Sequence, residues 1–464
     1  MFCIDKFPFF LLIMMFFFTI TPCLVIICLL IIGAVVWQDY VKNNKGEVVS
    51  GSNSEITETT EITESTEVLE EIETETETAV PEDTEIVEAE PIKNKIRLMM
   101  IGDNLMHVSI INSGYQADGS RNYDMLFETI KDHLELADIK ITNQETIFGG
   151  NDTGFTGYPL FNSPTEIGDA MVKAGFNVVL HGTNHAADRG IAGIQYCLNF
   201  WDKYPDMLVM GIYKEADVEN QDIGLLTVDG VTFAILNYTY SPNLASLPKE
   251  IQGHLGMLCD WDKNTGMINM TKLHPDVLTD IAKAKEMADV VIVCPHWGTE
   301  YTFVPSSYQR TFAEQMTEAG ADLILGTHPH VIQPIEWITS PNGNQALCYF
   351  SLGNYVSTQY RPQTMLEAMA WVVFETDGEQ VEIVEEETGA IPMVYQYRPG
   401  HSFENVYFLD EYTEALALQH GILVHGEPGF TYENVKTWAD EVLGNWRLQY
   451  QDVFKDCIKP EMWR

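Results

Sequence analysis

The sequence predicts an α/β protein in which two mixed β-sheets pack into a sandwich flanked by helices, preceded by an N-terminal transmembrane helix and a disordered acidic tether. Three observations predict this organisation. Strand-like and helix-like runs alternate from residue 93 onward, the strand-like runs become hairpins after about residue 330, and two segments of biased composition precede them. The expected divisions are a membrane anchor at 1–45, a linker at 46–92, a folded domain at 93–400 and a helical extension at 401–464.

The overall composition is that of a folded, acidic protein. Hydrophobic residues make up 45% of the 464 positions, which is enough for a large core. Sixty-eight acidic residues against 26 basic ones give a net charge of −42, so the basic surface that nucleic acid requires is absent. Eight cysteines without a CxxC pair do not form a disulfide scaffold or a zinc ribbon, and we expect most of them to be buried as small apolar side chains.

The first biased segment is an uncharged run at residues 7–37, longer than the roughly 20 residues that cross a bilayer core. We expect an uncleaved membrane anchor here. Pro22 permits either one kinked helix or a re-entrant pair, and we favour a single span because each arm of a pair would be short. The charges that flank the run balance on each side, so they do not fix its orientation.

The second biased segment, residues 46–91, contains 16 acidic residues and no Lys or Arg. Such a segment cannot bury enough apolar area to offset its chain entropy, and its like charges repel, so an extended disordered tether is expected. Without these 16 charges the remainder of the chain still carries about −26, and the folded part is therefore acidic in its own right.

The folded region begins with alternating strands and helices. Strands are expected at 95–103, 137–145, 177–184, 222–228, 231–240, 289–296 and 322–328, and helices at 122–136, 165–176, 190–204, 275–288 and 306–320. The Asp229–Gly230 pair predicts a hairpin turn. Further hairpin-like runs occupy 332–338, 346–356 and 371–386, and the last residues look helical around 412–421 and 435–454.

Polar side chains follow the predicted strands where each strand ends. In chain order they are Asp103 and His107, Asn143 and Glu145, Asn184, His185 and Asp188, His296 and Glu300, and His328 and His330. Any one of them could be a surface or hydrogen-bonded residue, but ligands of α/β folds gather at the carboxyl ends of strands, so together they predict one site. His181 is expected to pack into the interior instead, and the other histidines have no such setting.

This mixture of imidazole, carboxylate and amide groups suits borderline divalent ions such as Mn, Fe or Zn. The lack of thiolates argues against a structural zinc site. These side chains are more numerous than the ligands of one tetrahedral ion, whereas two ions about 3.5–4 Å apart could bind them all. Such a pair of ions activates water and stabilises charge on a phosphoryl group.

The motifs GDNLMH, NQE, TNHAADRG, HWGTEY, GADLILGTHPHVIQ and SLGNY, in this order between Lys95 and Val356, resemble the bacterial capsule-synthesis family that includes the poly-γ-glutamate biosynthesis proteins CapA and PgsA. That family is similar to calcineurin-like metallophosphoesterases, so the resemblance implies a calcineurin-like metallophosphoesterase-type sandwich. It also implies a set of metal ligands: Asp103, Glu145, Asn184, His296, His328 and His330. His185 would be the acid that protonates a leaving oxygen.

Three further residues are candidates for this site. His107 stands four residues after Asp103, whereas phosphoesterases carry a histidine two residues after the aspartate, as Asp-x-His. We include His107 among the candidate ligands. Asp188 and Glu300 would orient histidines of the site, although Asp188 could equally cap the helix that follows it.

The resemblance implies a single-pass cell-membrane protein with its catalytic domain outside the cell, acting in synthesis or export of an anionic extracellular polymer or its carrier, beside membrane subunits of a polymer synthase. A surface carrying about −26 repels a polyanion, so contact must run through the metal site or a local basic pocket. Two alternatives remain open: a non-catalytic assembly factor, and a membrane-tethered metallophosphoesterase with an unrelated substrate.

Overall fold

The computed structural model describes residues 94–152, 154–215, 221–400 and 402–454. The expected membrane anchor and acidic tether lie outside these ranges. Within them, no helix combines the length and the apolar character that crossing a membrane requires.

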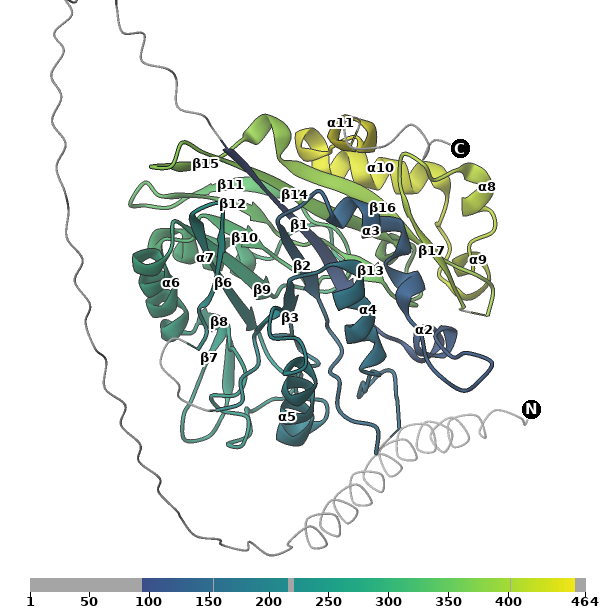
Figure 1. The fold of residues 1–464 in the computed structure, drawn as a ribbon, viewed down its shortest axis with the longest axis horizontal. Coiled ribbons are helices and arrows are strands. Elements are labelled where there is room, and N and C mark those ends of the chain that lie inside the picture. The colour runs from purple at the N-terminus through teal and green to yellow at the C-terminus, as the bar shows by residue number, and fades with distance from the viewer. Residues whose placement is uncertain (1–93, 153, 216–220, 401, 455–464) are drawn as a thin grey trace, which may run out of the picture. The chain divides into compact units, whose positions relative to one another are not determined.

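Two mixed β-sheets with helices form the described part of the chain (Figure 1), and the prediction of mixed α/β sheets is confirmed. Over the described residues the first sheet has nine strands: β1 (Asn94–Asn104), β2 (Ile139–Asn143), β3 (Val178–Leu180), β4 (Leu208–Met210), β13 (Asn354–Val356), β14 (Leu366–Thr376), β15 (Val381–Ile383), β16 (Gly389–Tyr397) and β17 (Phe403–Phe408). Their order is β17-β16-β14-β1-β2-β3-β4, with β13 beside β1 and β15 beside β14. Strands β1 to β4 are parallel, and β14, β16 and β17 continue the sheet in antiparallel fashion.

The second sheet has six strands in the same described ranges: β5 (Gly224–Val228), β6 (Val231–Thr239), β9 (Val290–His296), β10 (Leu323–Leu325), β11 (Ile335–Thr339) and β12 (Gln345–Tyr349). Its four central strands, β12-β10-β9-β6, are parallel, and antiparallel β11 and β5 form the edges. Strands β7 (Cys259–Trp261) and β8 (Ile268–Leu273) form a separate antiparallel pair.

Helices cover the sheets. They are α2 (Val108–Ser113), α3 (Glu128–Leu134), α4 (Glu166–Ala174), α5 (Gly190–Trp201), α6 (Pro275–Met287), α7 (Ser307–Ala319), α8 (Glu414–Ala417), α9 (Ile422–His425), α10 (Tyr432–Leu443) and α11 (Tyr450–Phe454). Helix α6 packs on β6 and β9, and α7 packs on β11 and β12. Helix α7 begins at a capping box in which Ser306 and Gln309 satisfy each other's backbone N–H groups.

The strands of the second sheet divide their side chains between two cores, as the two-residue period of a strand requires. Phe233 and Ile235 of β6 join the core between the sheets, whereas Ala234 and Leu236 join the core shared with α6 and α7. The ring of Phe233 meets that of Phe374 on β14 at 5.2 Å between centroids, edge to face. The two sheets therefore pack face to face.

The strands expected at 95–103, 137–145, 222–228, 231–240 and 289–296 and the helices expected at 165–176, 275–288 and 306–320 occur within two residues of their predicted bounds, and the other expected elements are shorter, shifted or divided. The hairpin at Asp229–Gly230 is confirmed: both residues have positive φ, as a type I′ turn demands, and β5 pairs with β6. The expected helix at 122–136 instead divides into a 3₁₀ turn, Asp124–Leu126, and α3.

The run expected at 346–356 is not one strand. Its first half, β12, lies in the second sheet, and its last residues, β13, pair with β1 in the first sheet. Gly353, with φ of +76°, stands at the crossing. This single segment thus connects the two sheets next to the predicted site.

The first sheet continues beyond residue 400, since β17 pairs with β16 and the backbone N–H of Leu448 donates to Ala390 O. Four of the cysteines, Cys197, Cys259, Cys294 and Cys348, lie in the described part of the chain, where all are buried and unbridged, as the sequence predicts for most of them.

Candidate metal centre

Parallel pairing aligns the polar side chains at the strand ends. Asp103 on β1 is in register with Asn143 on β2 and with Asn354 on β13. In the second sheet, His296 ends β9 and bridges to Thr327, directly before His328. Each sheet therefore brings its polar residues to one edge.

The position of Asp103 depends on a close approach between two backbone segments. A Cβ atom on Gly102 would lie 2.1 Å from Gly353 O, so only glycine fits there. The backbone N–H of Asp103 donates to that same carbonyl at 2.9 Å. The first and the last motif of the sequence, GDNLMH and SLGNY, are thereby joined.

The structure brings all six implied ligands, Asp103, Glu145, Asn184, His296, His328 and His330, into one buried cluster, in which none is more than 3% exposed. Asn184 Oδ1 lies 3.0 Å from His296 Nε2, and Asp103 Oδ2 lies 3.3 Å from His330 Nδ1. Two atoms bound to one ion at about 2.1 Å are separated by roughly 3.0–3.4 Å, so the pair of Asn184 and His296 fits a shared ion.

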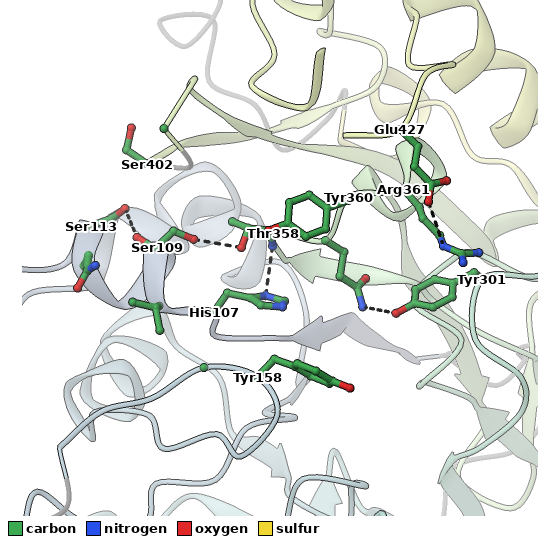
Figure 2. Close-up of a pocket in the computed structure, with 15 residues that line it drawn as sticks. His107, Ser109, Ser113, Tyr158, Tyr301, Thr358, Tyr360, Arg361, Ser402 and Glu427 are labelled. Carbon is green, nitrogen blue, oxygen red and sulfur yellow. Dashed lines mark hydrogen bonds and ion pairs between the residues drawn. The ribbon is translucent and has the colours of Figure 1, made fainter. Parts of the chain in front are cut away.

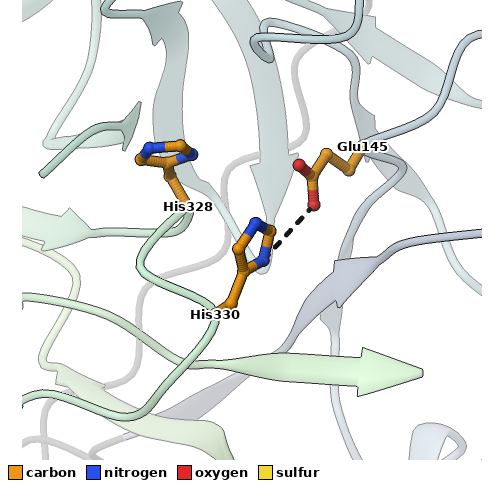
Figure 3. Close-up of side chains that lie close together, drawn as sticks. All are labelled: Glu145, His328 and His330. Atoms are coloured by element: carbon orange, nitrogen blue, oxygen red, sulfur yellow. Dashed lines mark ion pairs between the residues drawn. The ribbon is translucent and has the colours of Figure 1, made fainter. Parts of the chain in front are cut away.

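Glu145 lies at the centre of the cluster. Its Oε1 is 3.9 Å from His296 Nε2 and its Oε2 is 3.8 Å from His330 Nδ1. Glu145, His328 and His330 each offer a ligand atom, and these atoms lie within 4.8 Å of one another (Figure 3). The geometry is thus that of a possible metal site built from a carboxylate and two imidazoles.

The loop after β10 holds its two histidines in an unusual backbone conformation. His328 has φ of +96° and His330 has φ of +59°, a region that costs a non-glycine residue about 1–3 kcal/mol. Such strain persists where the surrounding structure determines it and clusters at functional sites. Here it places both rings on the side that faces Glu145 (Figure 3).

Several buried polar atoms of the cluster lack a hydrogen-bond partner within the described residues. They are both carboxylate oxygens of Glu145, Nδ1 of His328 and Oδ1 of Asn143. Leaving a buried charged group without a partner is costly. Each of these atoms could bind a metal ion or lies beside an atom that could. The residues present therefore fit a divalent ion.

The protonation equilibria of the cluster favour added positive charge. Burial raises the pKa of Glu145 well above its usual value, and the charge of Asp103 adds to the rise. Burial alone would lower the pKa of His330, but the carboxylates of Glu145 and Asp103 raise it to about 9. Burial lowers the pKa of His296 and of His328 far enough to keep both imidazoles neutral, which is the form that binds metal.

His185 and Asp188 form a pair at the border of the cluster. His185 Nδ1 lies 2.8 Å from Asp188 Oδ2, which also accepts the backbone N–H of Phe161 at 2.7 Å. The ring of Phe161 packs on that of His185 at 4.6 Å between centroids. The carboxylate of Asp188 therefore contacts His185, and the first turn of α5 has no side-chain cap.

His107 lies in the wall of a neighbouring cleft of about 910 Å³ (Figure 2). Its Nδ1 lies 3.3 Å from the backbone N of Thr358, and its ring meets Phe161 at 5.6 Å. Glu300, the other orienting candidate, is exposed. His181, by contrast, is buried, with its Nε2 accepting the indole N–H of Trp201, in agreement with its predicted packing role.

Two residues that support the histidines were missed by sequence reasoning. Asn354 Oδ1 lies 2.9 Å from His330 Nδ1, and Thr327 Oγ1 lies 3.0 Å from His296 Nδ1. Both stand inside quoted motifs, SLGNY and GADLILGTHPHVIQ; Thr327 follows the end of β10, and Asn354 is the first residue of β13. Groups of this kind fix the orientation of ligating rings.

Comparison with known families agrees with this cluster. Residues 97–359, more than half of the chain, match the family model described as bacterial capsule synthesis protein PGA_cap. The chain belongs to the PGA_cap family. The resemblance read from the motifs is thereby confirmed, and the matched range of this PGA_cap protein contains every candidate site residue.

Two relatives are capsule proteins of Bacillus. The PGA biosynthesis protein CapA of Bacillus subtilis (strain 168) is 32% identical over 204 residues, which cover 44% of this chain and 48% of that protein. The capsule biosynthesis protein CapA of Bacillus anthracis is 29% identical over 305 residues, covering 62% of this chain and 67% of that protein. The chain thus spans about half the length of the first relative and two thirds of the second.

Among solved structures, a novel phosphatase from Mycoplasma pneumoniae aligns over 65% of this PGA_cap chain and 95% of its own, with 17% identity and a TM-score of 0.36. That score is too low to carry an argument about function.

Proposed function

We propose that this protein is a membrane-anchored, extracellular member of a capsule or poly-γ-glutamate synthesis and export system, in which a calcineurin-like metallophosphoesterase-type domain binds divalent ions and hydrolyses a bond in the polymer or its carrier. Membership of the PGA_cap family supports the setting. The observation that carries the chemistry is Glu145, a fully buried carboxylate that faces two imidazoles and has no hydrogen-bond partner within the described ranges.

The ligands would be Asp103, Glu145, Asn184, His296, His328 and His330, with His107 as a further candidate on the cleft side. This set has room for two ions of Mn, Fe or Zn. Bound divalent ions would supply an activated water molecule and stabilise charge on the oxygen under attack.

The remaining chemistry belongs to side chains of the chain itself. With its Nδ1–H donated to Asp188, His185 would act as the acid in its protonated form, whose second N–H, at Nε2, would go to the leaving oxygen. Asp188 holds the ring in that orientation, and the backbone N–H of Phe161 holds Asp188. Neutral His296 and His328 keep their ring nitrogens available as ligands.

The membrane part of the proposal stands on composition. Residues 7–37 are uncharged and long enough to span a bilayer, and residues 46–92 would form the tether between membrane and domain. Membrane subunits of a polymer synthase would be neighbours in that arrangement. Fractionation of cells should find the full chain with membranes, and a chain lacking residues 7–37 in the soluble fraction.

The metal site is tested on the purified full chain, stripped with chelator and reloaded with Mn²⁺. Elemental analysis should find one to two ions per chain, and the loaded protein should hydrolyse a phosphoester or a γ-glutamyl polymer. His254→Ala is the matched control, because His254 bonds to Tyr213 O away from the cluster and its loss should leave the metal content unchanged. Failure of the wild type to take up any ion would refute the proposal.

A further inference from the structure

The cleft of about 910 Å³ beside the metal cluster has the size of a small-molecule or oligomer site. Its lining residues include His107, Ser109, Asn112, Tyr301, Gln359 and Arg361. Hydroxyl and amide groups from α2 form one side, and the segment that follows β13 forms the other (Figure 2).

Direct contacts join this cleft to the cluster. The ring of Tyr301 lies 5.9 Å from that of His330 between centroids. Gln359 donates its amide N–H to Tyr301 Oη at 3.1 Å and accepts from Asn354 Nδ2 at 2.9 Å. Because Asn354 also contacts His330, one side chain joins the wall of the cleft to the cluster.

Arg361 is the one Lys or Arg among the described residues that line the cleft. Its guanidinium carbon lies 4.3 Å from the centre of the Tyr301 ring, which holds the side chain over the wall of the cleft. Its charge stands out because the rest of the chain after the linker carries about −26. An anion that enters this cleft meets Arg361.

The present partner of Arg361 is weak. Arg361 Nε lies 3.9 Å from Glu427 Oε1, and the two side chains are 44% and 59% exposed. An exposed ion pair at this distance contributes little, so another carboxylate can replace Glu427 at low cost. The backbone N–H of Glu427 donates to Tyr360 O at 2.7 Å, which keeps Glu427 beside the arginine whether or not the pair forms.

We propose that the cleft is the substrate-binding cleft of the metal centre and that Arg361 is its specificity-determining residue, selecting a substrate that carries a carboxylate group. The guanidinium offers a rigid fork of donors that matches a carboxylate, and displacement of Glu427 accompanies binding. The serine, asparagine and glutamine side chains bind neutral amide or hydroxyl groups of the same molecule. This inference rests on the proposed function and names the substrate class of that site.

The test measures binding of two probes to the full chain by calorimetry at low ionic strength. The probes are a γ-linked glutamate oligomer and the γ-linked isoglutamine oligomer of equal length, in which each free α-carboxylate is replaced by a carboxamide. Wild type should bind the acidic oligomer more tightly than the neutral one. Arg361→Gln should weaken binding of the acidic oligomer roughly ten- to hundredfold and leave the neutral one unchanged. Arg361→Lys should fall between, because it keeps the charge and loses the fork.

Arg310→Gln is the matched control. Arg310 lies over the Phe350 ring at 5.0 Å and pairs with Glu336, so, like Arg361, it contacts one aromatic ring and one glutamate, but outside the cleft. The Arg310→Gln substitution changes the net charge of the protein by the same amount as Arg361→Gln. It should have no effect on either probe. Glu427→Gln should strengthen binding of the acidic oligomer several-fold, since it removes the competing carboxylate.

The inference is overturned if wild type does not bind the acidic oligomer or does not prefer it, or if Arg361→Gln and Arg310→Gln weaken binding equally. Each titration is repeated on chelated and on Mn-loaded protein. The preference that depends on Arg361 should appear in both, so a chain that binds no metal would refute the proposed function and still leave the role of Arg361 measurable.

Discussion

Asn184 and His296 stand 112 residues apart along the chain, yet Asn184 Oδ1 lies 3.0 Å from His296 Nε2. Asn184 follows β3 of the first sheet, and His296 ends β9 of the second. The contact therefore crosses between the sheets at the edge where their parallel strands end. An ion bound by both side chains would join the two sheets, so metal binding and stability of the fold should be coupled.

Addition of metal should stabilise the protein in proportion to its occupancy. At a free Mn²⁺ concentration of about 100 times Kd, the stabilisation is about 2.7 kcal/mol, which corresponds to a rise in Tm of roughly 3–6 °C for a domain of this size. Differential scanning calorimetry of chelated and reloaded wild type measures it. Glu145→Gln should abolish most of the rise, because it removes the central carboxylate.

The matched control is Glu336→Gln, on an exposed surface pair of β11. Its Tm should rise with Mn²⁺ as much as that of wild type. An equal rise in Glu145→Gln and in wild type would mean that Mn²⁺ stabilises the chain from another place, and it would contradict the coupling.

The region of the site could be predicted from the sequence because it depends on strand ends. Asp103 lies in the last two residues of β1 and Glu145 follows β2, and neighbouring parallel strands present their carboxyl ends at one edge whatever the details of packing. The register of Asp103 with Asn143 shows this rule directly. The resemblance to the capsule-synthesis family then singled out the six implied ligands, since His107 and Glu300 also follow strand ends and lie outside the cluster.

The supporting contacts could not be predicted in the same way. Asn354 lies beside His330 only because the run at 346–356 crosses from one sheet to the other at Gly353, and nothing in its hydrophobic pattern marks the crossing. Strand β16 was missed because it contains Gly389 and Pro392, which disfavour a strand, and lacks the run of β-branched residues that marks the equally buried β9. The position of Asn354 and the formation of β16 both depend on contacts between distant parts of the chain, which the local sequence does not show.

Asn354 should matter for metal affinity although it is not among the implied ligands. Its Oδ1 lies 2.9 Å from His330 Nδ1 and orients that ring. Asn354→Ala should weaken Mn²⁺ affinity roughly ten- to hundredfold, measured by competition with a fluorescent chelator. Gln359→Ala removes the bonds of Gln359 to Asn354 Nδ2 and to Tyr301 Oη but keeps the contact between Asn354 Oδ1 and His330, so its affinity for Mn²⁺ should stay close to that of wild type. Equal losses in both variants would indicate a general effect of the loop.

His185 should affect turnover without affecting metal content. Loss of a general acid lowers kcat by roughly 10²–10⁴, so His185→Ala should fall in that range on a phosphoester with a poor leaving group. Asp188→Asn should produce a smaller loss and shift the pH profile of kcat/KM, because a neutral amide replaces the carboxylate beside Nδ1 of the ring. Elemental analysis of both variants should match wild type. A His185→Ala protein with normal kcat and a full metal complement would assign the proton transfer to another group.

Glu367 should make the metal-free protein less stable as pH rises. This residue of β14 is fully buried, its Oε1 accepts the backbone N–H of Gly102 at 2.6 Å, and its Oε2 has no partner within the described residues. Burial raises the pKa of its carboxyl from 4.5 to about 8, with the hydrogen bond from Gly102 opposing and Asp103 adding to the rise. A group whose pKa is higher in the folded state contributes its full stability below its unfolded pKa and loses it as pH rises through the folded value.

Glu367 should thus reduce the free energy of unfolding of wild type between about pH 5 and about pH 9, with a total on the order of 4 kcal/mol. Glu367→Gln keeps an oxygen for Gly102 and cannot ionise, so its stability should fall less over the same range. Urea unfolding of chelated wild type and variant measures the difference, which cancels the contributions of the cluster residues that both proteins share. If the free energies of unfolding of the two proteins changed in parallel with pH, Glu367 would keep its ordinary pKa. Water or a cation would then have to reach its carboxylate, because burial without either must favour the protonated acid.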